Sequence, residues 1–153
     1  MRYAIVLALA LTGCATGYQS SGFGGGFSEM RMAQDTYAIN YRGNAFTGMD
    51  QVQEMATLRA AELTLQSGYT HFAILGANES SDRAYYNQPG TTTTTIQPTG
   101  FGNYQAQSST YGGYSVPIDK PKTQLIVKMM GAGQGGLDAQ EVYQQIAPRY
   151  IGQ

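Results

Sequence analysis

Hydrophobic and polar residues alternate along residues 27–44. The apolar side chains recur at every second position on both sides of Gln34-Asp35-Thr36, which are turn-forming residues. A period of two is typical of a strand with one buried and one wet face, so this stretch predicts two short strands around a turn. Gly43-Asn44 ends the second strand. The alternating apolar positions are Met30, Met32, Tyr37, Ile39 and Tyr41.

The hydrophobic period then changes to that of a helix, which we expect from about Gly48 to Ser67. Thr47 is placed as its N-cap, with Asp50 in a capping-box-like position. Gly68 is placed as the residue that ends the helix in the left-handed conformation. One apolar stripe forms, and further residues widen it. The stripe consists of Val52, Met55, Ala56, Ala60 and Leu63, with Leu58, Ala61 and Leu65 beside it.

Residues 69–76 are apolar at nearly every position, which predicts a central, well-covered strand. Residues 122–131 predict another strand. A last helix begins after Asp138, its expected N-cap, and Glu141 occupies the capping-box position. Its narrow apolar face consists of Val142 and Ile146, Leu137 and Val142 form a hydrophobic staple, and Pro148 is expected to end the helix.

Between these strands the composition changes. Residues 84–118 contain no charged residue and are rich in Thr, Tyr, Gly, Gln and Ser. Neither a helical nor a strand period extends over more than a few residues there. We therefore predict a long loop or disordered, low-complexity insertion over residues 77–121.

These elements together predict an α+β fold. Their order is ββα-β-insertion-βα, which suits a small, mostly antiparallel four-stranded sheet with two helices on one face. The domain would span residues 27–150 and be interrupted by residues 77–121. A sequence of 153 residues suits one small domain.

The N-terminus holds the only cysteine of the chain. Residues 3–11 form an apolar run that is too short to cross a bilayer but suits a signal peptide. Leu11-Thr12-Gly13-Cys14 follows it and resembles the lipobox of bacterial lipoproteins. The resemblance implies that residues 1–13 are removed and that the sulfur of Cys14 carries lipid, which anchors the chain to a membrane. Ala15 after the cysteine implies the periplasmic face of the outer membrane, and residues 14–26 are expected to be a flexible tether.

Two further blocks of the sequence stand out, one around residues 26–47 and one around residues 59–72. The residues that carry the resemblance are Gly26 to Glu29, Arg42 to Asn44, Thr47, Arg59 to Leu65, Gly68, Tyr69 and Phe72. These blocks resemble an uncharacterised family of short Gram-negative lipoproteins. The resemblance covers roughly the N-terminal half of the chain and implies no activity.

Charge and composition narrow the function classes. The formal net charge of -1 gives no electrostatic reason to expect nucleic acid. A single cysteine excludes an internal disulfide or a CxxC site, and a single histidine, His71, leaves no metal-ligand set. Arg42-Gly43-Asn44 could hold an anion through backbone N–H groups, although a turn needs Gly and Asn for its own geometry. We identify no catalytic residues, no metal site and no cofactor.

The remaining candidates are weak binding residues. Arg59 and Glu62 lie three apart on the first helix, where they can pair, and a cleft near His71 could use them. Tyr104, Tyr111 and Tyr114 lie in the low-complexity insertion, where aromatic rings could contact a partner. Two hypotheses follow. The chain is a non-enzymatic interaction module of the envelope that binds a protein or the cell wall, or it is a periplasmic ligand-binding or hydrolytic domain.

Overall fold

The structure is a computed structural model that describes residues 17–151. Within this range the chain forms two compact units, residues 17–81 with 120–151, and residues 82–119, here called the hairpin unit. The fold is α+β with two helices and mostly antiparallel strands, which confirms the predicted class. The predicted four-stranded sheet is wrong, because the described residues form seven strands in two sheets.

The larger sheet has five strands in the order β1-β2-β6-β3-β7. The predicted β1–β2 hairpin is confirmed, with Phe27 opposite Tyr41. The predicted apolar face of the first strand is wrong, because Met30 and Met32 are 61% and 56% exposed and the core residues Tyr41 and Ile39 lie opposite Phe27 and Glu29 instead. The strand missing from the prediction is β7, where Asp138 pairs with His71 in addition to capping the following helix. The strands are β1 (Gly26–Arg31), β2 (Thr36–Arg42), β3 (His71–Gln88), β6 (Tyr114–Met130) and β7 (Leu137–Asp138).

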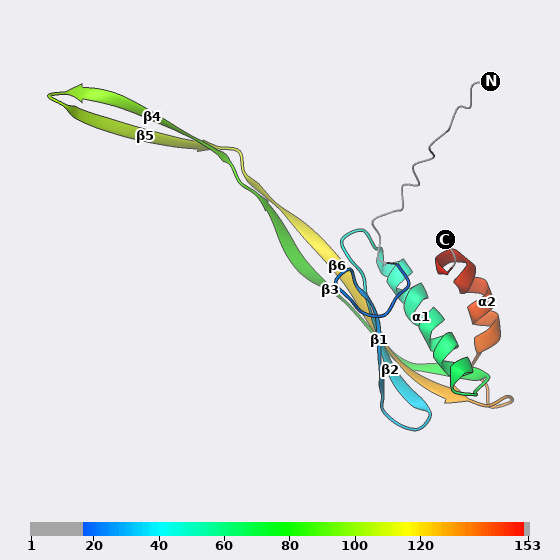
Figure 1. The fold of residues 1–153 in the computed structure, drawn as a ribbon. Helices are drawn as coiled ribbons and strands as arrows, with labels where there is room; N and C mark the ends of the chain where they lie inside the picture. Colours follow the sequence, from blue (N-terminus) through cyan, green and yellow to red (C-terminus); the bar gives the residue numbers. More distant parts are fainter. Residues whose placement is uncertain (1–16, 152–153) are drawn as a thin grey trace, which may run out of the picture. The chain divides into compact units, whose positions relative to one another are not determined.

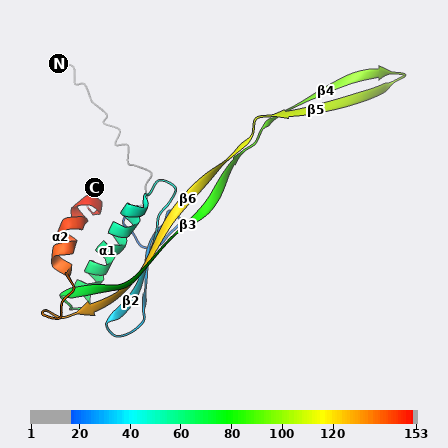
Figure 2. The ribbon, with the colours of Figure 1, turned by 180° about the vertical axis from the view of Figure 1, so that it is seen from behind.

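Both helices, α1 (Met49–Gln66) and α2 (Ala139–Tyr150), cover one face of this sheet (Figures 1 and 2). Alternate residues of β2 and β6 point into the core beneath α1, as the period of two predicts. Burial of these apolar side chains is the main stabilising contribution. The sheet side of the core consists of Ile39, Tyr41, Phe72, Leu125, Val127 and Met129, and α1 contributes Val52, Met55, Ala56, Ala60, Ala61 and Leu63.

The N-cap of α1 differs from the prediction, whereas the C-terminal end of the helix agrees with it. Gly48, not Thr47, is the N-cap, and the Gln51 side chain accepts a hydrogen bond from the Gly48 N–H at 3.1 Å. The Thr47 hydroxyl instead lies 3.0 Å from Asn44 Oδ1 and fixes the preceding loop. At the other end Gly68 has a φ of +81°, and its N–H bonds to the Leu65 carbonyl, which confirms the predicted glycine C-cap.

Helix α2 begins as predicted and ends later than predicted. The Asp138 side chain accepts a hydrogen bond from the Glu141 N–H at 2.9 Å, which confirms the N-cap. Pro148 does not end the helix, since α2 continues to Tyr150. A proline in the last turn removes only one N–H donor. The hydrogen bond that follows it is still made, since the Ile151 N–H reaches the Ala147 carbonyl at 2.8 Å.

Strand β3 is less covered than its apolar sequence predicts. Phe72 is buried, but Ile74 and Leu75 are 39% and 61% exposed. An apolar run fills both faces of a strand, whereas the helices of this fold cover one face only. The prediction of a well-covered strand is therefore wrong beyond the first residues of β3.

The hairpin unit replaces the predicted loop over residues 77–121 with strands. Strands β4 (Thr91–Gly100) and β5 (Asn103–Tyr111) pair antiparallel, and the ends of β3 and β6 also belong to this unit. Thr92 bonds to Thr110 at 2.9 Å across the strands. Threonine and tyrosine favour strands, yet every residue of β4 is exposed. Without a buried face no period of two is required, which is why the pattern gave no signal.

Residues 17–26 also differ from the predicted flexible tether. The Phe27 N–H bonds to the Gln19 carbonyl at 2.9 Å, and the Ser21 N–H bonds to the Phe27 carbonyl at 2.7 Å. The contact requires glycine at Gly26, where an added Cβ would lie 2.5 Å from the Gln19 carbonyl oxygen. The segment therefore packs on the domain. Cys14 and the signal sequence lie outside the described residues.

Candidate functional site

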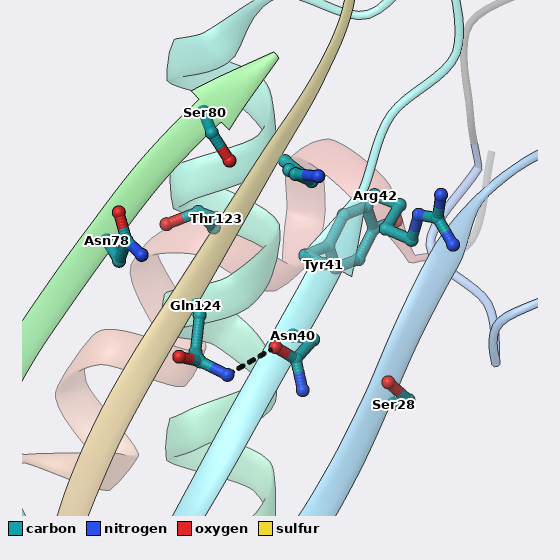
Figure 3. Close-up of a pocket in the computed structure, with 9 residues that line it drawn as sticks. Ser28, Asn40, Tyr41, Arg42, Asn78, Ser80, Thr123 and Gln124 are labelled. Atoms are coloured by element: carbon teal, nitrogen blue, oxygen red, sulfur yellow. Dashed lines mark hydrogen bonds between the residues drawn. The ribbon is translucent and has the colours of Figure 1, made fainter. Parts of the chain in front are cut away.

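The face of the large sheet opposite the helices carries a shallow polar groove with a volume of about 440 Å³ (Figure 3). We call it the open-face groove. Asn40 and Arg42 alternate with the core residues Ile39 and Tyr41, so they point away from the helices. The residues that line the groove are Ser28, Asn40, Tyr41, Arg42, Asn78, Ser80, Lys122, Thr123 and Gln124.

Strand register places the polar side chains of the groove in rows. Ser28 lies opposite Asn40, and Asn40 lies opposite Gln124. Gln124 Nε2 donates to Asn40 Oδ1 at 2.9 Å (Figure 3). This bond fixes both amide planes and uses neither Asn40 Nδ2 nor Gln124 Oε1, a donor and an acceptor. The row is therefore equipped to recognise groups that both donate and accept hydrogen bonds.

The next row of the groove is cationic. Arg42 on β2 lies opposite Lys122 on β6. None of the nine lining residues is acidic. The two cationic side chains give this row of the groove a positive charge. The groove therefore suits a polar ligand that carries carboxylate or phosphate groups.

The predicted Arg59–Glu62 pair is present and belongs to a larger cluster, which we call the N-terminal clamp. Arg59 Nη1 lies 2.9 Å from Glu62 Oε2, and Arg59 Nη2 lies 2.8 Å from Glu29 Oε1. The Tyr18 hydroxyl donates to Glu62 Oε2. The Arg59 guanidinium lies over the Phe27 ring at 4.4 Å from its centroid, a cation–π geometry. The clamp thus joins α1, β1 and the N-terminal segment.

The environment of the clamp perturbs two pKa values. Burial and the hydrogen bond to Glu62 raise the pKa of the Tyr18 hydroxyl well above its ordinary value. Burial of Arg59 tends to lower its pKa, but hydrogen bonds to Glu29 and Glu62 outweigh this and raise it. Arg59 is charged throughout the physiological range in either case. The cluster holds the segment in place through a satisfied, charge-assisted network.

A surface hollow adjoins the clamp. Its volume is about 490 Å³, and Ser20, Phe27, Glu29 and Arg59 are among its lining residues. The Arg59 side chain is only 13% exposed and already contacts both carboxylates. Arg59 and Glu62 therefore act mainly on each other and on the N-terminal segment.

His71 lies at the first position of β3, away from the contacts of the clamp. Its Nδ1 is 2.9 Å from the Thr70 hydroxyl, and its Nε2 is 4.0 Å from Asp138 Oδ2. In the described residues, no hydrogen bond or ion pair joins His71 to Arg59 or Glu62. The structure therefore does not bring the three predicted residues into one cluster.

The three predicted tyrosines lie in the hairpin unit. Tyr104, Tyr111 and Tyr114 are 74%, 72% and 60% exposed. The Tyr114 hydroxyl donates to Gln88 Oε1 at 3.3 Å. Their rings are open to contact from solvent.

Residues 17–151 lack two further features. This part of the chain contains no cluster of three or more His, Cys, Asp or Glu side chains placed to hold a metal ion. It also contains no helix that is long and apolar enough to span a membrane. Comparison with protein-family models, curated proteins and solved structures gave no match.

Sequence reasoning missed the open-face groove and the role of Tyr18. The signal for the groove was present in the polar positions of β2, Asn40 and Arg42, which were assigned only to a wet face. Gln124 and Lys122 could be added only through the β2–β6 pairing, which the sequence does not reveal.

Proposed function

We propose that this chain is a lipid-anchored lipoprotein of the cell envelope that binds a polar, anionic partner through its open-face groove. The lipobox-like residues 11–14 support the anchor, which would attach Cys14 to the periplasmic face of the outer membrane. The observation that carries the binding role is the groove itself, where Asn40 and Gln124 lie beside Arg42 and Lys122.

The chemistry of the groove suits recognition without covalent catalysis. Hydroxyl, amide and cationic groups orient a ligand and neutralise its charge. The open, shallow shape suits an extended polymer, and both an acidic segment of an envelope protein and the cell wall present carboxylates to such a surface. The role is that of an interaction module.

The experiment is crosslinking in cells of the tagged, lipidated chain, followed by mass spectrometry of the captured material. The test variant combines Arg42→Glu with Lys122→Glu, which reverses the charge of the groove. Lys128→Glu is the matched control. Lys128 lies an even number of positions along β6 from Lys122, on the same face of the strand, but does not line the groove. Cys14→Ser tests the anchor.

A partner captured by the native chain and by Lys128→Glu, but lost in the double variant, supports the groove as the binding site. Its identity as protein or cell-wall fragment names the partner class. Capture that persists in the double variant contradicts the groove. Unchanged membrane attachment of the Cys14→Ser chain contradicts the anchor.

The predicted alternative, a ligand-binding or hydrolytic cleft near His71, has weaker support. It requires His71 to act with Arg59 and Glu62, which contact each other and Tyr18 instead. Replacement of His71 by Gln tests it, since a catalytic or ligand-binding role predicts that cells with a normal level of the variant behave like cells that lack the protein.

A further inference from the structure

We propose that the end of the domain carrying Phe23 and Phe46 sits in the surface of an anionic membrane. This inference rests on the proposed anchor at Cys14, and it adds a second contact between the protein and the lipid. The lipid chain would then orient the domain as well as retain it.

Two aromatic side chains at this end lie open to water. Phe23 is fully exposed in the turn between Ser20 and Gly26, and Phe46 is 70% exposed in the loop before α1. A phenyl ring gains free energy when it leaves water, so exposed phenylalanines on loop tips are poorly placed in solution. At a membrane interface the same rings enter the region between headgroups and acyl chains.

Contacts bring the two loops to the same end of the sheet. A hollow of about 200 Å³ is lined by Phe23 together with Arg42, Asn44 and Lys120. Asn44 Oδ1 accepts a hydrogen bond from the Phe46 N–H at 2.8 Å, so Phe46 follows directly from the wall of this hollow.

The N-terminal segment starts at the same place. The Gly17 carbonyl accepts a hydrogen bond from the Tyr41 hydroxyl at 2.9 Å, beside Arg42 at the end of β2. Tyr18 is held by the clamp. Covalent geometry limits the distance between the Cα atoms of Cys14 and Tyr18 to about 14 Å. A lipid on Cys14 therefore keeps Tyr18 and the residues around it within a short distance of the bilayer.

The charge of this end complements an anionic lipid surface. Arg42 and Lys120 line the hollow beside Phe23, and Lys122 follows on β6. Asp50 in the first turn of α1 is the acidic residue nearest to Phe46 in the sequence. Cations beside interfacial aromatic rings are the pattern of a surface that binds headgroups with its charges and acyl chains with its rings.

The lipidated cysteine makes a clean test possible. Cys14 is the only cysteine, so once it carries lipid an introduced cysteine is the only free thiol. Phe23→Cys and Phe46→Cys are labelled with the fluorophore NBD in the lipidated full chain. Met32→Cys is the control, because Met32 is 56% exposed but follows β1 at the opposite end of the hairpin from Arg42. The proteins are placed in phosphatidylethanolamine–phosphatidylglycerol vesicles with and without doxyl-labelled lipid.

We expect a blue shift of NBD emission and quenching by doxyl lipid at positions 23 and 46, and neither at position 32. Emission at 23 and 46 that matches position 32 overturns the inference. Mass spectrometry of Cys14 is done first, and a chain without lipid contradicts the proposed function itself. Lys120→Gln should reduce the quenching in the anionic vesicles, whereas in vesicles without phosphatidylglycerol it should leave the quenching unchanged. If the unsubstituted Lys120 chain is quenched equally in both lipid mixtures, the proposed attraction between the cations of this end and anionic lipid is contradicted.

Discussion

Replacement of Tyr18 by Phe tests whether the N-terminal clamp holds residues 17–26 on the domain. The substitution removes the hydroxyl that donates to Glu62 and keeps the ring, which lies 5.2 Å from the Phe27 ring and 6.5 Å from the Tyr41 ring between centroids. Any loss of stability therefore reports the hydrogen bond and not the packing.

The magnitude follows from the surroundings of the bond. A hydrogen bond to a charged group contributes about 1.5–3 kcal/mol to stability. Glu62 keeps its ion pair with Arg59, and the site is only partly buried. We therefore expect Tyr18→Phe to lower the free energy of unfolding by about 1–2 kcal/mol. Tyr18→Ala should cost more, because it also exposes the face of Phe27.

The assay is urea unfolding of a lipid-free chain that begins at Ala15, with hydrogen exchange of residues 19–27 as the local probe. Exchange of these amides should accelerate in the variant, since they depend on the docked segment. Tyr104→Phe removes a hydroxyl from a residue that is 74% exposed and should change neither measurement.

A double-mutant cycle with Glu62→Gln decides the reasoning. If Tyr18 and Glu62 act through their shared bond, the two losses should be non-additive by roughly 0.5–3 kcal/mol. Additive losses, or unchanged exchange in Tyr18→Phe, would refute the clamp.

Three further predictions concern stability. Thr123 is 2% exposed and its hydroxyl has no hydrogen-bond partner among the described residues, so Thr123→Val should raise the free energy of unfolding by about 1 kcal/mol, whereas an unchanged or lower value in urea unfolding would show that the hydroxyl is satisfied. Burial raises the pKa values of the Tyr18 and Tyr41 hydroxyls in the folded state, so folding favours their protonated forms. Their contribution to the free energy of unfolding is therefore complete below about pH 10 and is lost as the pH rises, by up to about 1.4 kcal/mol per pH unit for each tyrosine. A free energy of unfolding that does not change with pH above pH 10 contradicts this. Pro148→Ala restores an N–H donor in the last turn of α2 and should raise the free energy of unfolding by about 1–3 kcal/mol in the same assay, so an unchanged or lower value would contradict this.

The sequence was informative where one face of an element is buried. The alternation of Ile39 and Tyr41 with polar residues and the stripe of α1 both depend on a covered face, and both appear in the structure as predicted. The caps at Gly68 and Asp138 were equally readable, because each depends on local geometry.

Prediction failed where the deciding contact is long-range or where no face is buried. The open-face groove requires the pairing of Asn40 with Gln124, which are distant in the sequence. The N-terminal segment looked like a tether because its composition is rich in Gly and Ser. It packs on the domain through backbone bonds to Phe27 and through the bond of Tyr18 to Glu62, and neither contact can be read from composition. In the hairpin unit, exposed strands leave no hydrophobic period to read.

The pairing of β2 with β6 also fixes when the domain can fold. Ile39 lies opposite Leu125, so the sheet cannot close until the chain beyond Leu125 has emerged from the ribosome. Until then β2 and α1 expose the apolar side chains that Leu125, Val127 and Met129 later cover. Closing so long a loop costs entropy before any contact repays it, which slows folding. The five-stranded sheet therefore forms only late in the synthesis of the chain.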